Sequence, residues 1–133
     1  MEIKDFFKDD RYASLACVEL IDVREGWAKA RMEVKDFHLN AGNVVQGGAI
    51  FTLADLAFAA AVNSYGNLAV SIQTNISYFK SVSGGTLFAE AKLVNLHRKL
   101  ATFHIDVTNE KDELVATLSA TAYRKEVPLP FYL

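Results

Sequence analysis

Residues 38–63 decide the fold, and they read HLNAGNVVQGGAIFTLADLAFAAAVN. The run from Gly47 to Ser64 is rich in alanine and leucine and contains no proline, as is typical of a helix. It is followed by Tyr65-Gly66, where glycine can close a last helical turn. We therefore predict one long helix that begins at the glycine pair Gly47-Gly48.

The predicted helix is apolar nearly all round, so we expect other elements to wrap it. Its only carboxylate is Asp55. Burying an unpaired charge costs on the order of several kcal/mol, so this acid needs a physical reason. At 100° per residue, one stripe of small and polar residues falls within about 60°. The stripe consists of Gly48, Thr52, Asp55, Ala59 and Asn63. We expect it to face something other than core.

The composition predicts one globular domain over residues 1–133, with an N-terminal helical arm at 1–12 and a C-terminal tail at 126–133. The chain is 51% hydrophobic and 23% charged, with a formal net charge of −2. This balance gives no general attraction to nucleic acid or to an anionic membrane. The N-terminal segment lacks the apolar core of a signal peptide, and a single cysteine excludes an intrachain disulfide. We expect a soluble, cytoplasmic protein.

Alternation of apolar and polar residues predicts strands on both sides of the helix. Before it, Leu15–Asp22 and Trp27–Val34 form an expected hairpin. After it come four runs, with a turn at Ser83-Gly84-Gly85 after the first: Val70–Phe79, Thr86–Leu96, Leu100–Thr108 and Leu114–Arg124. The short connections between the later runs require antiparallel neighbours. The predicted order is a hairpin, a long buried helix and an antiparallel meander, which is an α+β fold.

One antiparallel sheet curled around one central helix is the hotdog fold. The segments His38-Leu39-Asn40-Ala41-Gly42, Val45-Gln46-Gly47-Gly48 and Leu53-Ala54-Asp55 resemble the signature of the phenylacetate-pathway type of acyl-CoA thioesterase. That type lies within the broader 4-hydroxybenzoyl-CoA thioesterase superfamily. The resemblance runs from about Ala13 to Arg124 and includes the strand Val70–Tyr78. It implies the hotdog fold and hydrolysis of an acyl- or aryl-CoA to the free acid and coenzyme A.

The residues themselves supply parts of such a site. Thioester hydrolysis needs a nucleophile or base and donors that stabilise negative charge on the carbonyl oxygen. A helix start at Gly47 and Gly48 offers free backbone N–H groups and the positive end of the helix dipole. Asp55, however, lies about 10 Å farther along the axis, too far to share one carbonyl with its own helix start. Either the substrate runs along the groove or another subunit intervenes.

The resemblance implies the second solution, in which the acid of one protomer faces the helix start of its partner. The protein would then be a homodimer, or a dimer of dimers, with two sites per dimer. Asp55 would act as nucleophile or general base, and the Gly47 N–H would polarise the carbonyl. Asn40 would orient the water or the acid, and Ser71 would support the carboxylate or the water.

Gln46 stands where the family commonly has a histidine. An amide can donate a hydrogen bond to the carbonyl or the sulfur, but it cannot deliver a proton to the departing thiolate. Thioester cleavage can survive this change because a thiol is a good leaving group. Gly48 and Thr52 would line the substrate groove. In the basic turn His97-Arg98-Lys99, Arg98 and Lys99 are the candidates for binding the phosphates of coenzyme A.

Each candidate also has a purely structural interpretation. Asp55 can be a structural carboxylate at a subunit interface, and Asn40 can form a turn with Gly42. The glycine pair can serve helix-to-sheet packing alone, and Ser71 can be an ordinary strand side chain.

Three alternative functions remain open. The first is a non-catalytic acyl-CoA-binding protein, which Gln46 favours. The second is a hydratase of the same fold, which would need a histidine near the helix. The third is an assembly module, which leaves the polar stripe unexplained. Neither metal nor cofactor is required by the sequence, and coenzyme A enters only as part of the substrate.

Overall fold

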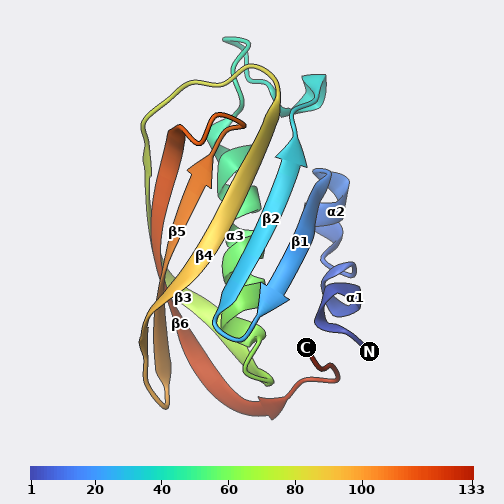
Figure 1. The fold of residues 1–133 in the computed structure, drawn as a ribbon, viewed down its shortest axis with the longest axis vertical. Helices are drawn as coiled ribbons and strands as arrows, with labels where there is room; N and C mark the ends of the chain where they lie inside the picture. Colours follow the sequence, from blue (N-terminus) through green and yellow to red (C-terminus); the bar gives the residue numbers. More distant parts are fainter.

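The computed structural model describes all 133 residues. They form one antiparallel sheet with a long helix packed against one face (Figure 1). The helices are α1 (Ile3–Phe7), α2 (Arg11–Leu15), the short 3-10 helix η1 (Asp36–His38) and α3 (Gly47–Asn63). The strands are β1 (Val18–Arg24), β2 (Trp27–Glu33), β3 (Asn67–Tyr78), β4 (Thr86–Leu96), β5 (Leu100–Thr108) and β6 (Leu114–Pro128). The predicted hairpin, central helix and α+β class are confirmed, and the architecture is the hotdog fold.

The sheet has the strand order β1-β2-β4-β5-β6-β3. The meander is confirmed for β4, β5 and β6. The turn at Ser83–Gly85 does not bring β3 beside β4, because β3 pairs with β6 and β4 pairs with β2. Residues 79–85 instead cross the end of the molecule where α3 begins (Figure 1). Along this crossing the carbonyl of Val82 accepts a hydrogen bond from the N–H of Val45, just before the helix.

Alanine makes the close packing of α3 on the sheet possible. Fully buried alanines line both surfaces, since a methyl group lets a helix backbone approach a sheet closely. On the sheet they are Ala28, Ala30, Ala89, Ala91, Ala116, Ala120 and Ala122, and on the helix Ala54, Ala57, Ala60 and Ala61. Larger side chains such as Phe58 and Phe103 fill the remaining space, with their rings in an edge-to-face contact.

The polar stripe of α3 is the part of the helix that the sheet does not cover. Gly48 is exposed, and Thr52, Asp55 and Ala59 are half-buried. Asn63 departs from the expectation, because its amide is buried and bonds the backbone of Ala59 and Ala69. That residue ties the helix end to β3, and the open stripe therefore runs from Gly48 to Ala59.

The element boundaries differ from the predicted ones mainly at the two ends of the chain. The N-terminal arm forms two short helices rather than one, and Leu15 belongs to α2 instead of β1 because Asp10 caps a helix there. Strand β6 continues past Arg124 to Pro128, and the chain then runs beside the N-terminal segment. Phe131 packs against Phe6, and the two termini lie close together (Figure 1).

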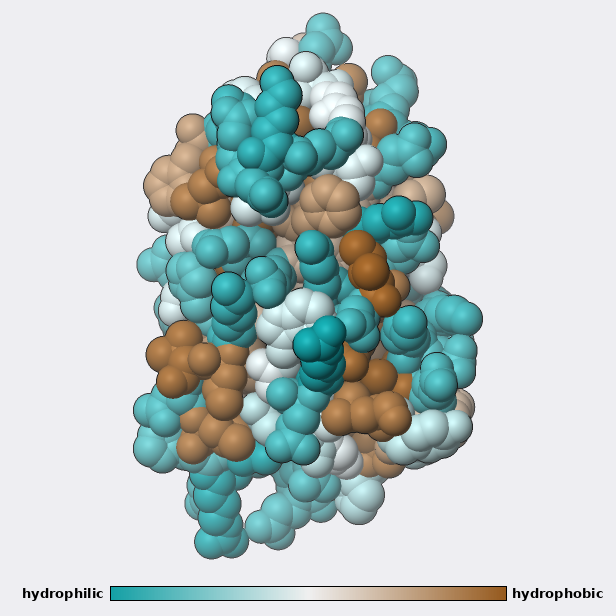
Figure 2. Space-filling view, in the orientation of Figure 1, coloured by the Kyte–Doolittle hydropathy of each residue, from teal (hydrophilic) through white to brown (hydrophobic).

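The outer face of the sheet, opposite α3, is mixed in character. In Figure 2 hydrophilic and hydrophobic side chains alternate across this face without one continuous apolar patch. No helix of the structure combines the length and the apolar character that crossing a membrane would require.

Candidate active site

The start of α3 presents two unpaired backbone donors. Gln46 is the N-cap residue, and its carbonyl accepts from the N–H groups of Ala49 and Ile50. The N–H groups of Gly47 and Gly48 donate to nothing within the chain. Two free donors at the positive end of a 17-residue helix can bind the oxygen of a polarised carbonyl.

Each glycine of the pair has a different neighbour. A Cβ atom on Gly48 would stand 2.7 Å from the side-chain oxygen of Gln46, which lies over the helix start. A Cβ atom on Gly47 would stand 3.1 Å from the ring of Tyr78. The hydroxyl of Tyr78 also donates to the carbonyl of Gly47 over 2.9 Å. The glycine pair thus leaves room for two polar side chains at the helix start.

Asp55 is half-buried on the open stripe and makes no hydrogen bond or ion pair within the chain. Burial raises the pKa of its carboxyl above the ordinary value, and the negative charge of Asp10 raises it further. Asp10 caps α2 by accepting from the N–H of Ala13 over 3.0 Å. An unpaired carboxylate with a raised pKa is suited to accept a proton.

One chain does not bring the acid and the donors together. Asp55 lies two helical turns beyond the glycine pair on the same helix, about 10 Å along the axis. The two halves of the predicted site are therefore present, but they are separated within the protomer.

Asn40 lies in the loop before α3, and its side chain builds a turn. Its Oδ1 accepts from the N–H of Gly42 over 2.8 Å and from the N–H of Val44 over 3.3 Å. A bridge between Leu39 and Val45 closes the same loop next to the helix start. The structural interpretation of Asn40 is confirmed, and its amide nitrogen, which makes no bond, stays a candidate donor.

Ser71 is exposed on β3, where its hydroxyl lies 3.2 Å from that of Thr74. It makes no contact with Asp55 in the same chain. Strand β3 forms one edge of the sheet and carries exposed apolar side chains, among them Ile72, which is 58% exposed. Its supporting role for the acid stays a prediction that needs a second chain.

A groove of about 250 Å³ runs beside the first turns of α3. Gln46, Ala49 and Thr52 form its helical wall. Opposite them stand Tyr12 of α2 and Phe37 of η1, both largely exposed. Thr52 contributes its methyl and Cβ side, because its hydroxyl donates back to the carbonyl of Gly48 over 2.8 Å. The sequence patterns did not single out Tyr12 and Phe37, since these aromatic residues are distant in sequence from the groove's helical wall.

Arg98 and Lys99 lie at the β4–β5 turn, at the opposite end of the molecule from the start of α3 (Figure 1). Together with Arg124 and Lys125 they line a surface hollow of about 470 Å³. Arg98 contacts Glu126 at 3.3 Å, with both side chains more than four-fifths exposed, so the pair adds little stability. The basic side chains of the hollow suit an anionic group. The hollow lies far from the backbone N–H groups of Gly47 and Gly48 in the same chain.

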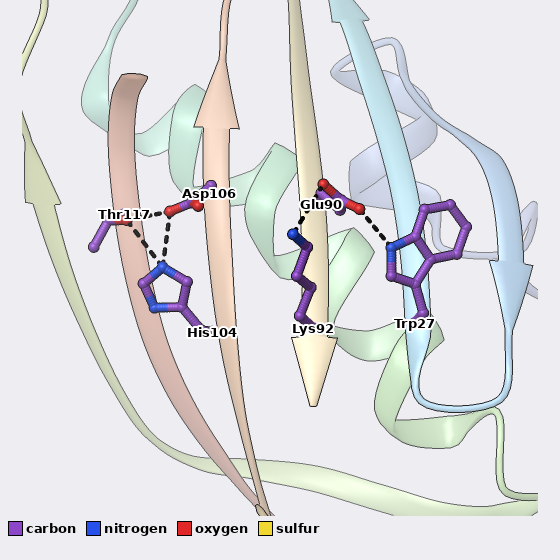
Figure 3. A network of polar contacts seen from close by, with 6 residues as sticks. All are labelled: Trp27, Glu90, Lys92, His104, Asp106 and Thr117. Carbon is purple, nitrogen blue, oxygen red and sulfur yellow. Dashed lines mark hydrogen bonds and ion pairs between the residues drawn. The ribbon is translucent and has the colours of Figure 1, made fainter. Parts of the chain in front are cut away.

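The side chains of two histidines, His38 and His104, have partners other than Asp55, although His38 also lines the groove beside Gln46. His38 is buried, with Nε2 lying 2.6 Å from the carbonyl of Ala16 and Nδ1 accepting from the N–H of Lys35. His104 stands on the outer face of the sheet, where Asp106 lies 2.8 Å from its ring and also accepts from Thr117 (Figure 3). Trp27 and Glu90 form a second polar contact on that face. Groups of three or more His, Cys, Asp or Glu side chains with metal-binding geometry are absent.

Comparison with known proteins gives a consistent result. The model of the thioesterase superfamily matches residues 42–116. A protein of Archaeoglobus fulgidus, provisionally named an esterase, is 45% identical over 130 residues, which cover 96% of this chain and 84% of that protein. The acyl-coenzyme A thioesterase PaaI of Escherichia coli K12 is 30% identical over 119 residues, covering 89% of this chain and 85% of that one.

Solved structures agree with these relatives. The structure of the E. coli PaaI protein superimposes with a TM-score of 0.89 at 29% identity, over 93% of this chain and 91% of that one. A Streptococcus mutans protein solved with bound acetyl CoA gives a TM-score of 0.80 at 29% identity, over 84% and 91% of the two chains. The residues matched by the family model include the start of α3, Asp55 and strands β3, β4 and β5.

Proposed function

Because the chain belongs to the thioesterase superfamily, we propose that it hydrolyses an acyl-CoA thioester to a carboxylic acid and free coenzyme A. Family membership makes it a thioester hydrolase, so the alternative of a protein that only binds acyl-CoA is not retained. The observation that carries the proposal is the unpaired Asp55 carboxylate on the open stripe that begins at Gly48, where the N–H groups of Gly47 and Gly48 are both free. No metal or further cofactor enters the mechanism.

The reaction needs only groups that the chain carries. The Asp55 carboxylate accepts a proton from water as the water oxygen adds to the thioester carbon. The carbonyl oxygen becomes negatively charged and accepts hydrogen bonds from the N–H groups of Gly47 and Gly48. The carbon–sulfur bond then breaks, and the thiolate takes the proton back from Asp55. Gln46 supports this step as a hydrogen-bond donor, since an amide does not supply a proton.

We further propose that the site forms between two copies of the chain, with Asp55 of one copy facing the helix start of the other. The separation of about 10 Å within one chain supports this arrangement. The free edge of β3 also supports it, because the backbone groups of an edge strand and exposed apolar side chains such as Val70 and Ile72 favour pairing with a second strand. A dimer built in this way has two sites, and two dimers can assemble further into a tetramer.

The test is thiol release from a panel of aryl, short-chain and long-chain acyl-CoAs, with Asp55→Asn as the matched variant. We expect turnover of at least one class and a loss of about 10²-fold or more in kcat for Asp55→Asn. Binding of CoA esters without turnover of any class would contradict the proposal. Full activity of Asp55→Asn would contradict the proposed role of Asp55 as the base, while the protein would still be a thioester hydrolase.

The phosphates of coenzyme A are proposed to lie against Arg98 and Lys99 of the partner copy. We expect the double substitution Arg98→Gln with Lys99→Gln to raise KM about 3- to 30-fold for a CoA thioester, since each charge contact contributes modestly at an exposed site. A thioester of pantetheine, which lacks these phosphates, should show no change. Lys111→Gln in the β5–β6 turn is the control. An equal effect on both substrates would contradict phosphate binding at this turn.

A further inference from the structure

Tyr78 makes a contact at the helix start that neither family membership nor the sequence pattern assigns. It is the last residue of β3, and its hydroxyl donates to the carbonyl of Gly47 over 2.9 Å. The atoms joined are 31 residues apart in the chain. In a regular helix the carbonyl of Gly47 already faces the N–H of Phe51, so it has no structural need for a second donor.

The backbone around Tyr78 is held by β6, which sets the position of the side chain. Tyr78 pairs with Ala116 of β6, and the N–H of the next residue, Phe79, donates to the carbonyl of Val115 over 2.8 Å. Tyr78 as a whole residue is 48% exposed, and it borders a hollow of about 340 Å³ lined in part by Val44, Ile50 and Phe79. Because this hollow leaves room for the ring to turn, the hydroxyl bond to Gly47 fixes its orientation.

The hydroxyl acts on a peptide group that the proposed reaction uses. The carbonyl of Gly47 and the N–H of Gly48 belong to one planar, resonance-stabilised unit. A hydrogen bond to the carbonyl oxygen draws electron density from the nitrogen and makes the attached N–H a stronger donor, by roughly 10–30% per bond in condensed-phase estimates. The N–H of Gly48 has no partner in the chain, so it is free to donate this stronger hydrogen bond to a substrate.

We propose that Tyr78 is a positioning residue of the hydrolytic site, whose hydroxyl holds the Gly47–Gly48 peptide and strengthens the Gly48 N–H as a donor to the thioester oxyanion. This inference rests on the proposed function. Two further observations agree with it. The ring occupies the space that a side chain at position 47 would need, which couples the glycine to the tyrosine. Burial raises the pKa of the Tyr78 hydroxyl, so the group stays protonated and able to donate at neutral and mildly alkaline pH.

The first test is Tyr78→Phe, which keeps the ring and removes the donor. We expect kcat to fall about 3- to 10-fold with KM changed less than twofold, because the polarised N–H matters most when charge develops on the carbonyl oxygen. Tyr132→Phe is the matched control, since the Tyr132 side chain makes no hydrogen bond. The wild type and Asp55→Asn are measured in the same assay.

The second test changes donor strength without removing the group. Replacing Tyr78 by 3-fluorotyrosine makes the hydroxyl more acidic and a stronger donor, and we expect kcat at pH 6.5 to exceed the wild-type value. A purely structural hydroxyl would not respond in this direction. Three results would overturn the role of Tyr78: wild-type kcat in Tyr78→Phe, a change confined to KM, or an unchanged or lower kcat with fluorotyrosine. Turnover that still depends on Asp55 would keep the proposed function in each case. Absence of turnover in the wild type overturns both.

Discussion

At the scale of single residues, Asp55 carries the conflict between stability and activity. The carboxyl is half-buried without a partner, and its pKa is raised by burial and by the charge of Asp10. A raised pKa in the folded state means that the ionised form is disfavoured by folding. The free energy of unfolding is therefore highest below the pKa that Asp55 has in the unfolded chain. It decreases as the pH rises through the pKa that Asp55 has in the folded protein. Above the folded pKa, the ionised acid that the proposed mechanism uses therefore lowers the stability of the fold.

We accordingly expect Asp55→Asn to raise Tm at pH 7 while it lowers kcat by about 10²-fold or more. The gain should shrink as the pH falls through the raised pKa of folded Asp55, and it should be absent below the ordinary carboxyl pKa of about 3.9, where the wild-type side chain is neutral in both states. Thermal unfolding of both proteins between pH 3 and pH 8 measures this. A variant that is less stable than the wild type at pH 7 would show that Asp55 has a structural partner, in line with the structural interpretation.

At the scale of elements, α2 influences a residue on α3 through the charge that caps it. Asp10 satisfies the N–H of Ala13, and the same carboxylate raises the pKa of Asp55. The α2 segment also supplies Tyr12 to the groove beside Gln46 and Thr52. The N-terminal arm, which the sequence predicts only as a helical arm at residues 1–12, is thus part of the surroundings of the proposed site.

Asp10→Asn separates the two roles of this cap, since asparagine caps a helix about as well as aspartate but carries no charge. We expect the pKa of Asp55 to fall and the acidic limb of kcat/KM to move to lower pH, with the rate on the alkaline side unchanged. Tm on the alkaline side should rise slightly, because the ionised acid is no longer repelled by Asp10. Asp9→Asn is the control, because Asp9 is exposed and does not contribute to the shift. Coinciding pH profiles for Asp10→Asn and the wild type would contradict the coupling.

At the scale of the whole molecule, the proposed active site depends on a two-fold related partner. In Figure 1 the start of α3 and the β4–β5 turn lie at opposite ends of one chain. In a symmetric pairing along β3 the two copies run in opposite directions. The helix start of one copy would then lie near the end of the partner that carries the β4–β5 turn. The proposed reaction then requires the dimer.

Mixing two inactive variants tests this directly. Asp55→Asn removes the acid, and Gly48→Val covers the free N–H groups with a side chain whose Cβ atom would meet only the end of Gln46. A mixed dimer keeps one intact site, so random exchange of equal amounts should restore about a quarter of the wild-type activity. Sites contained within one chain would give no recovery. Sedimentation measurements on each variant confirm that it still assembles.

The sequence alone predicted much of the fold because its signals are local. The apolar run without proline, the glycine pair and the alternating strands each depend on a few neighbouring residues. The position of β3 beside β6 was not predictable, since the crossing of residues 79–85 follows from packing over the helix start and not from a turn motif. Asn63 is a similar case, because its position on the helix did not predict the hydrogen bonds that its side chain makes with the backbone of Ala69.

For the site, the sequence by itself determined which groups have chemistry to offer: the lone acid Asp55, the donors of Gly47 and Gly48, and an amide at Gln46. Helix geometry also set the distance that keeps the acid from its own donors. Only the tertiary structure decided what surrounds them, namely that Asn40 is bound into a turn, that Asp10 lies close enough to shift Asp55, and that Tyr78 bonds Gly47. The physical reason is that spacing along a helix is a local property, whereas burial and contacts between distant segments arise when the sheet closes around it.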